Sequence, residues 1–475
     1  MKQFIILAIC VMYFSTCVSQ VITRKVLNQE EAAQCDCLKN WHWLKETFEN
    51  NDAGFQWAID KKGMERYQQF CDSIEVELKK ASDIYECEKI IKDWGKFFRK
   101  GHFFVGLNQF TQAAEAPVNT ETVHYSIETV KAQIQELKDT LIGIWHSHPY
   151  TIGIVRDTIN LNRKYVGFII KSEVEEWKEG EVKVEFFEAH PQLSANLYLR
   201  DHSLWKTNAR LISDAELIIG NSKFLNTLKI DPLEQQLLST ANPLFFNLSD
   251  ETALLRIPSF NSAKTDEINT LIKLNEKSIL SHKNLIIDLR GNDGGSDYSW
   301  REIIPFIYTN PIKTIGVEFY STLLNRSLYY DNLPFFRRII ANKHIRKSKK
   351  NDGKFVVRDS FFIQKLKTIH PQPQKVIILV DEDCVSSAEQ FIFAAKQSTK
   401  TTIYGKQTFG ALDVSNLVRV FTPDNCFLMS YGVTRTLRPA AERIDDIGIV
   451  PDVSIPDYIP KYKWINYVVE ELKSR

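Results

Sequence analysis

Two short stretches in the second half of the chain decide the fold class. Residues 285–295 read LIIDLRGNDGG, and residues 376–391 read VIILVDEDCVSSAEQF. Each opens with an apolar run of strand length and continues into a polar turn, and the second turn leads into a helix-forming run. Strands and helices alternate in the same way from about residue 237 onward, so the sequence predicts an α/β core.

Ser386 stands where the second turn meets its helix. A hydroxyl at that point lies at the positive end of the helix macrodipole, among backbone N–H groups that have no intrahelical partner. Such groups can stabilise a developing oxyanion, which makes Ser386 a candidate nucleophile. Serine is also a preferred N-cap residue, so simple helix capping is the alternative interpretation.

Taken together, the two stretches resemble the tail-specific (C-terminal processing) and tricorn-core serine peptidase family. That family carries an Asp-Leu-Arg-x-Asn-x-Gly-Gly loop and a later Ser-x-x-Glu turn, which match residues 288–295 and 386–389. Two further stretches, GKQTFG at 405–410 and GIVPD at 448–452, also match family positions. The resemblance therefore covers roughly residues 254–456.

The resemblance implies a crotonase- and Clp-protease-like β/α core and a serine endopeptidase whose nucleophile is Ser386. Its substrates would be flexible polypeptides or peptide tails, cleaved through an acyl-enzyme without a metal or cofactor. The backbone N–H groups of Ser387 and of Gly294 or Gly295 are the expected oxyanion donors, because glycine lets the loop approach the scissile carbonyl.

The general base implied by the resemblance is His102. The Ser-Lys branch of the family places its lysine directly after a Thr-x-Gly turn, but here residues 408–410 are followed by Ala411, which cannot take a proton. Lys406, on the other side of that turn, leaves a Ser-Lys mechanism as the alternative. The tricorn-like branch instead uses a histidine after the N-terminal helices, and His102 matches it with Lys100 in place of the usual aspartate. A neutral imidazole, with a pKa near about 6.5, suits this role.

An acidic residue is expected to hold the base. In the tricorn-like branch it lies three positions before the glycine of a Gly-x-x-Pro-Asp ending, and counting back from Gly448 gives Asp445. Glu442 is close enough in sequence to take the role instead. A solvated loop acid is the alternative interpretation of either residue.

The N-terminus has the three regions of a secretory signal. A lysine at position 2 precedes an apolar stretch from Phe4 to Phe14, and a polar segment follows, with cleavage expected near Ser19. Acylation at Cys17 is disfavoured because Phe14 replaces the small aliphatic residue expected there. The later sequence contains no run of about 18 apolar residues, so we expect an exported protein, periplasmic or extracellular, without a transmembrane segment.

Four of the eight cysteines cluster in the N-terminal helical segment. In an oxidising compartment Cys35, Cys37, Cys71 and Cys87 indicate two disulfides, and Cys35 and Cys37 are too close to bridge each other. We therefore expect each of these two to pair with Cys71 or Cys87. A third bridge between Cys384 and Cys426 is an option if their strands are adjacent.

The periodicity divides the chain into a signal peptide (1–19), an N-terminal helical domain that carries His102 (20–135), a β-rich barrel-like module (136–235) and the α/β core (236–475). The core contains a helical insertion at about 298–370, which we interpret as a lid. Its cations Arg338 and Arg346 are candidates to bind a peptide carboxylate, and a solvated basic face is the alternative.

Composition excludes some partners. With 60 basic and 59 acidic residues the chain has a net charge of +1, which gives no global case for nucleic acid or an anionic membrane. His146 and His148 lie two apart on an extended segment but have no third ligand nearby, so no metal site is predicted. A catalytically inactive member that binds peptides or apolar ligands is the alternative function, and the sequence leaves the oligomeric state open.

Overall fold

The computed structural model describes residues 35–108, 121–188, 193–331, 333 and 335–474. The predicted signal peptide and Cys17 lie outside these residues. Among the described residues, no helix combines the length and apolarity needed to cross a bilayer.

The α/β core is built on a six-stranded sheet with the order β10-β11-β12-β17-β18-β21. All neighbours in it are parallel except β10, which runs antiparallel to β11. Parallel strands with both faces covered read as continuous apolar runs, which explains the patterns that opened the sequence analysis. The strands are β10 (Leu244–Asn247), β11 (Thr252–Arg256), β12 (Asn284–Asp288), β17 (Lys375–Val380), β18 (Thr401–Gly405) and β21 (Val453–Ser454).

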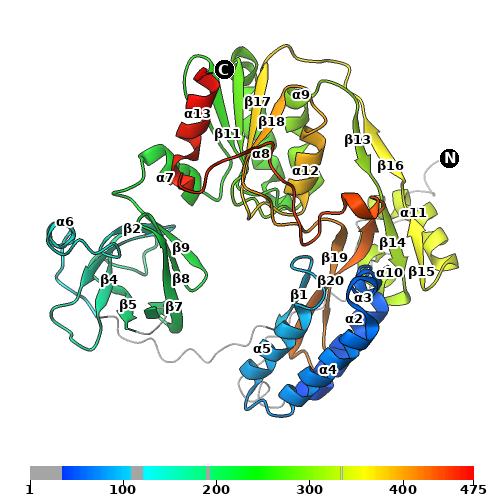
Figure 1. The fold of residues 1–475 in the computed structure, drawn as a ribbon, viewed down its shortest axis with the longest axis horizontal. Coiled ribbons are helices and arrows are strands. Elements are labelled where there is room, and N and C mark those ends of the chain that lie inside the picture. Colours follow the sequence, from blue (N-terminus) through cyan, green and yellow to red (C-terminus); the bar gives the residue numbers. More distant parts are fainter. Residues whose placement is uncertain (1–34, 109–120, 189–192, 332, 334, 475) are drawn as a thin grey trace, which may run out of the picture.

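Helices cover both faces of this sheet (Figure 1). Alternate residues of β12 and β17 enter two separate apolar clusters, as the two-residue repeat of a strand requires. One cluster includes α8 (Thr265–Ser281), α9 (Ile304–Ile307) and α12 (Ser387–Ala395), and the other includes α7 (Pro232–Ser239) and α13 (Trp464–Ser474).

The N-terminal helices lie against a second sheet, and this contact brings the two halves of the chain together. The short strand β1 pairs antiparallel with β20, so that Phe103 faces Tyr431. A cluster of buried aromatic side chains, among them Phe48 and Trp94, joins the helices to this sheet. The helices are α2 (Cys37–Asn51), α3 (Phe55–Lys62), α4 (Met64–Leu78) and α5 (Ile84–Gly95), and the strands are β1 (Phe103–Leu107), β14 (Val317–Ser321), β15 (Lys354–Val357), β19 (Val414–Phe421) and β20 (Phe427–Thr436).

Strands β2 to β9 form a closed barrel, at the left in Figure 1. The α6 helix (Ile127–Leu137) contributes its buried Val130 to the barrel's apolar cluster. The expected boundary at residue 135 assigns α6 to the N-terminal helices, whereas its apolar side packs against β2 and β3. The strands are β2 (Gly143–Ser147), β3 (Tyr150–Arg156), β4 (Tyr165–Ser172), β5 (Val182–Phe187), β6 (Leu193–Tyr198), β7 (Leu204–Ser213), β8 (Glu216–Ile219) and β9 (Ser222–Asn226).

The insertion at 298–370 is not purely helical, contrary to the sequence-based expectation. It contains the helices α10 (Leu323–Tyr330) and α11 (Phe335–Lys350), but also four strands. Of these, β14 pairs with β20 and β15 pairs with β14, while β13 (Ile312–Ile315) and β16 (Phe361–Gln364) form a separate two-stranded ribbon. Each of these strands is only four or five residues long, and such short runs give little periodicity to detect.

The disulfide pattern differs from the expected one. Cys37 pairs with Cys87, which is one of the two partners expected for it, but Cys35 pairs with Cys426 in the second half of the chain. Cys71 and Cys384 are buried free thiols. The β1–β20 pairing is the reason, because it brings the start of β20 to the N-terminal helices, and no local spacing could reveal it.

Candidate active site

Ser386 occupies a strained turn between β17 and α12. Its φ and ψ are 62° and −117°, a backbone conformation that residues other than glycine rarely adopt. Such strain persists only where the surroundings enforce it, and it is most frequent at functional sites. The residue is partly exposed, and its own amide donates to Glu389 Oε2 at 3.1 Å.

Glu389 links this turn to the loop at 408–411. Its carboxylate is fully buried and accepts four hydrogen bonds, from the Thr408 hydroxyl at 2.6 Å and from the amides of Gly410, Ala411 and Ser386 at 2.8, 2.9 and 3.1 Å. Burial raises the pKa of this carboxyl above its usual value. The second residue of the Ser-x-x-Glu motif therefore has a positioning role, which the sequence analysis did not assign.

The glycine-rich loop lies directly against the nucleophile. A Cβ on Gly294 would come within 2.5 Å of the Val385 carbonyl and 2.8 Å of the Ser386 Cβ, so only glycine fits there. The Gly294 amide donates to the side chain of Asn292 at 2.9 Å and is therefore occupied. Within the described residues, the amides of Gly295 and Ser387 donate to no other protein group, which leaves these two as the available oxyanion donors.

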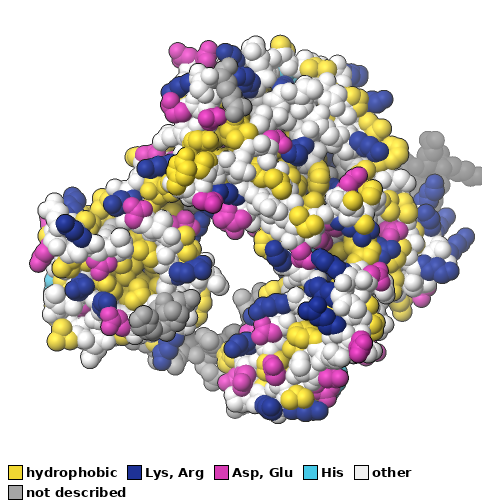
Figure 2. Space-filling view, in the orientation of Figure 1, with side chains coloured by type: hydrophobic (Ala, Val, Ile, Leu, Met, Phe, Trp, Pro, Cys, Tyr) yellow, Lys and Arg dark blue, Asp and Glu magenta, His cyan; other side chains and the backbone are white. Residues whose placement is uncertain are grey.

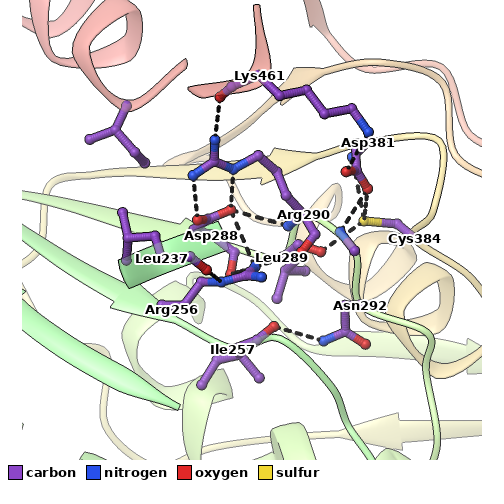
Figure 3. A network of polar contacts seen from close by, with 12 residues as sticks. Leu237, Arg256, Ile257, Asp288, Leu289, Arg290, Asn292, Asp381, Cys384 and Lys461 are labelled. Carbon is purple, nitrogen blue, oxygen red and sulfur yellow. Dashed lines mark hydrogen bonds and ion pairs between the residues drawn. The ribbon is translucent and has the colours of Figure 1, made fainter. Parts of the chain in front are cut away.

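The Asp-Leu-Arg segment forms the support beneath this loop (Figure 3). Arg290 is fully buried and pairs with Asp288 at 2.8 Å and with Glu234 at 3.0 Å. Across the loop, Asp381 accepts from the Gly291 amide at 2.8 Å and pairs with Lys461 at 2.9 Å. Buried charges are tolerated because they are paired in this way, and the network fixes the loop relative to β17.

Cys384 belongs to the same support and not to the reactive centre. Its thiol donates to the Leu289 carbonyl at 3.0 Å (Figure 3), and the residue is fully buried. Burial raises the pKa of this thiol well above its ordinary value. A thiol that stays protonated is a poor nucleophile.

His102 lies next to Ser386 although 284 residues separate them in sequence. Its Nε2 is 3.0 Å from the Ser386 Oγ, and its Nδ1 is 2.5 Å from the carbonyl oxygen of Val414. A carbonyl can only accept, so Nδ1 carries the proton and Nε2 is free to accept from the serine hydroxyl. Burial, with Arg99 nearby, lowers the pKa of His102 to about 4, so the ring is neutral near pH 7.

The backbone around His102 is fixed by a buried ion pair. Arg99 donates to both carboxylate oxygens of Asp52, at 2.8 and 2.6 Å, and also to the His102 carbonyl at 2.8 Å. His102 itself has a φ of 54°, in the left-handed region. The turn between α5 and β1 therefore fixes the backbone of His102, and with it the position from which the imidazole extends.

Asp445 does not bind the imidazole directly, contrary to the sequence-based expectation, because both ring nitrogens already have partners. Its carboxylate instead accepts from the amides of Leu412 and Asp413, both at 2.7 Å, and of Val414 at 3.1 Å. The Asp413 carboxylate in turn accepts a hydrogen bond from the Asp445 amide at 2.8 Å. Burial and the charge of Asp413 raise the pKa of Asp445 to about 6. Asp445 thus holds the segment whose carbonyl orients His102.

The remaining candidates lie apart from this centre. Glu442 is exposed in a short turn, and Lys406 pairs with Asp457. Arg338 pairs with Asp331 at 2.9 Å, and neither it nor Arg346 contacts Ser386 or His102. Among the described residues no group of three metal-ligating side chains occurs, His146 and His148 included.

Several functional side chains escaped the sequence analysis. Asp52 and Arg99 form the pair behind His102, and Asp413 clamps the loop that contains Val414. An aspartate with an arginine 47 residues later carries no recognisable motif. The carbonyl of Val414 could not have been found from any residue type, because every residue has one.

Comparison with known proteins finds matches in the second half of the chain. The family model described as "Peptidase family S41" matches residues 251–455. A "Probable CtpA-like serine protease" of Staphylococcus epidermidis (strain RP62A) is 27% identical over 215 residues, which are 45% of this chain and 35% of that protein. A protein of the same description from Staphylococcus aureus (strain COL) is 36% identical over 93 residues, 20% of this chain and 18% of its own. The chain thus spans about a third or less of the length of these relatives.

A solved structure resembles the whole described fold. Mature CPAF, in complex with lactacystin, gives a TM-score of 0.51 at 12% sequence identity, and the alignment covers 92% of this chain and 97% of that one. At this level of identity the likeness concerns the fold, which is a mixed α/β fold as the sequence predicts.

Proposed function

We propose that this chain, which belongs to peptidase family S41 through its residues 251–455, is a serine peptidase that uses Ser386 as nucleophile and His102 as general base. The single observation that carries the proposal is the 3.0 Å contact between the Ser386 Oγ and the His102 Nε2. A nucleophile, a base within hydrogen-bond reach and a group that orients the base are the parts that acyl transfer requires.

The reaction follows from the position of each proton. Nε2 takes the hydroxyl proton of Ser386 as Oγ attacks the scissile carbonyl carbon, and the amides of Ser387 and Gly295 donate to the resulting oxyanion. The intermediate collapses when Nε2 passes its proton to the leaving amine, which departs and leaves an ester on Ser386. In deacylation, water attacks the ester carbonyl carbon while Nε2 takes its proton. Nε2 then returns that proton to the Ser386 Oγ as the carboxylic acid is released.

The Val414 carbonyl takes the place that a carboxylate has in the Ser-His-Asp arrangement. It fixes the tautomer but carries no full negative charge, so it stabilises the imidazolium less. The low pKa of His102 agrees with that environment. We propose that Asp445 acts on the imidazole indirectly. Its carboxylate accepts from the Val414 amide at 3.1 Å and so positions the Val414 carbonyl that orients the ring.

The proposal extends to the substrate, the location of the protein and the type of its core. We propose flexible polypeptides or peptide tails as substrates, because the nucleophile lies in a loop-lined and partly exposed position. The disulfides Cys35–Cys426 and Cys37–Cys87 support an oxidising, exported location. A parallel sheet with helices on both faces supports a crotonase-like core.

A fluorophosphonate probe tests the proposal directly, since it reacts with an activated serine. We expect wild-type protein to be labelled at Ser386 and to cleave an unfolded polypeptide, and Ser386→Ala to lose both properties. Loss of the nucleophile costs on the order of a million-fold in rate in a serine protease. Ser387→Ala is the matched control, because the Ser387 hydroxyl donates to Asp297 at 2.6 Å and accepts from Trp300 at 3.1 Å, and its backbone amide is kept in the variant. A folded wild-type protein that is neither labelled nor active at any pH would instead support a binding function.

A further inference from the structure

The helix α11 presents an unusual outer face. At about 100° per residue, Phe335, Phe336, Ile339 and Ile340 fall on one side of the helix, and Lys343, Arg346, Lys347 and Lys350 continue the same side. The four apolar side chains are 72, 78, 56 and 83% exposed, so none of them packs into the fold. The face is therefore apolar at its N-terminal end and cationic at its C-terminal end.

The inner side of α11 is already occupied. Ser348 is buried, its carbonyl accepts from the Ser321 hydroxyl at 2.8 Å, and Ala341 and Ile345 pack against the aromatic cluster under the second sheet. His344 hydrogen-bonds Tyr330 on α10. The helix is thus anchored to the fold by its inner side, and its outer face is left exposed.

The positive charge of α11 is largely unbalanced. Its sequence FFRRIIANKHIRKSKK contains seven Lys and Arg residues and no acidic one, in a chain whose net charge is +1. Within the described residues, the ion pair of Arg338 with Asp331 is the only one that α11 forms. Figure 2 shows these cations gathered at the right edge of the molecule, where Figure 1 places α11.

We propose that α11 docks this protein onto an anionic phospholipid surface. The four apolar side chains would enter the interface between headgroups and acyl chains, and the cations would contact the headgroup phosphates. Amphipathic helices bind bilayers through this combination of apolar area and electrostatic attraction. A bilayer accommodates side chains that protrude from a convex helix, as these do, whereas protein partners are typically bound through packed pockets.

A second copy of the chain fits this face less well. Two-fold contact through this face would bring its four cations close to the four of the other protomer, and like charges brought together cost several kcal/mol of repulsion. Against an anionic surface the same cations are attracted instead of repelled. Docking needs neither Ser386 nor His102, so it stands or fails separately from the peptidase proposal.

A side chain of α11 outside this face approaches the segment that follows the glycine-rich loop. The Arg337 guanidinium sits 5.4 Å from the ring of Tyr298, and Tyr298 follows Gly294 and Gly295 by only a few residues.

Vesicle co-sedimentation tests the docking. The Ser386→Ala protein, chosen to prevent self-cleavage, is expected to sediment with phosphatidylcholine vesicles that contain phosphatidylglycerol and not with phosphatidylcholine alone. Ile339→Glu together with Ile340→Glu should lower partitioning by about tenfold or more, because two exposed apolar side chains are lost from the interface. Lys343→Ser with Lys347→Ser should lower it roughly fivefold per cation, the equivalent of about 1 kcal/mol each.

Matched changes on α8 provide the control. Leu274 is 78% exposed and Lys273 and Lys277 are exposed beside it. Lys273→Ser with Lys277→Ser makes the same cation changes elsewhere, and Leu274→Glu is compared with Ile340→Glu alone. These variants should bind vesicles as the parent does. Equal loss in the α8 and α11 variants, or no binding to anionic vesicles, would overturn the proposal. Self-association in sedimentation that the α11 glutamates abolish, without vesicle binding, would assign the face to a second copy instead.

Discussion

The Nδ1 of His102 donates to the backbone carbonyl of Val414 at 2.5 Å. The candidate base is thus oriented by a neutral group in a buried setting. A carboxylate in that position would raise the pKa of the ring by stabilising its charged form, whereas burial favours the neutral form. The arrangement is suited to a base that is unprotonated well below neutral pH.

The pH dependence of activity follows from this setting. With a His102 pKa of about 4, protonation of the ring should abolish activity only in strongly acidic solution, and activity should rise as pH increases through about 4. A second rise is expected near pH 6, where Asp445 loses its proton and its carboxylate can accept all three loop amides. The pH profile of kcat/KM with a fluorogenic peptide measures both. A single rise near the ordinary histidine pKa of about 6.5 would contradict the burial argument.

Asp445→Asn should reduce kcat on the order of a hundredfold with little change in KM. The amide side chain cannot accept from all the amides of residues 412–414, so the Val414 carbonyl moves and the imidazole loses its alignment. The variant should also lack the ionisation near pH 6 while it keeps the one near pH 4, which a merely destabilised protein would not do. Glu442→Gln is the control, and its exposed side chain should leave the profile unchanged.

Two further substitutions separate the Ser-His from the Ser-Lys mechanism. His102→Ala should abolish acylation, because no other base lies within reach of the serine hydroxyl among the described residues. Lys406→Ala should retain most activity, since Lys406 pairs with Asp457 and does not contact Ser386. Burst-phase kinetics with an ester substrate report acylation directly. A folded but inactive Lys406→Ala protein, or an active His102→Ala protein, would restore the lysine mechanism.

The sequence predicted what depends on short-range pattern. The apolar runs at 285–287 and 376–380 indicated strands of an α/β core, and the motifs that follow them led to the peptidase family whose model matches residues 251–455. Ser386 could be nominated because a strand, a turn and a helix start within a few residues of it.

What the sequence could not give depends on long-range pairing. His102 was named as the base through the family resemblance alone, since its contact with Ser386 depends on the pairing of β1 with β20 and nothing near residue 102 specifies that partner. The same pairing explains the error in the disulfides, where Cys426 replaces Cys71. Asp445 was assigned to the ring because family position gives a residue but not the atom it binds.

Glu389→Gln should destabilise the protein by about 2–4 kcal/mol and lower activity with it. The carboxylate accepts four hydrogen bonds in a fully buried site, and a glutamine would turn an NH2 group toward two of the donors. Buried donors left without acceptors carry their full desolvation cost. Urea unfolding gives the loss of stability, and Glu382→Gln on the exposed side of the same turn is the control. Unchanged stability in Glu389→Gln would mean that the buried network does not fix the nucleophile turn.

Reduction of the disulfide Cys35–Cys426 should loosen the pairing on which the active site depends. The bridge joins residues 391 apart in sequence and fastens the start of α2 to the start of β20, the strand that β1 joins immediately after His102. Loss of a disulfide that closes a long loop typically costs about 2–5 kcal/mol. We expect Cys35→Ser with Cys426→Ser to lower the urea midpoint and to lose peptidase activity before global unfolding. Cys71→Ser, at a buried free thiol, should leave the bridges intact. Peptide mapping without reductant should recover Cys35 linked to Cys426, and a Cys35–Cys71 or Cys35–Cys87 peptide in its place would refute this connectivity.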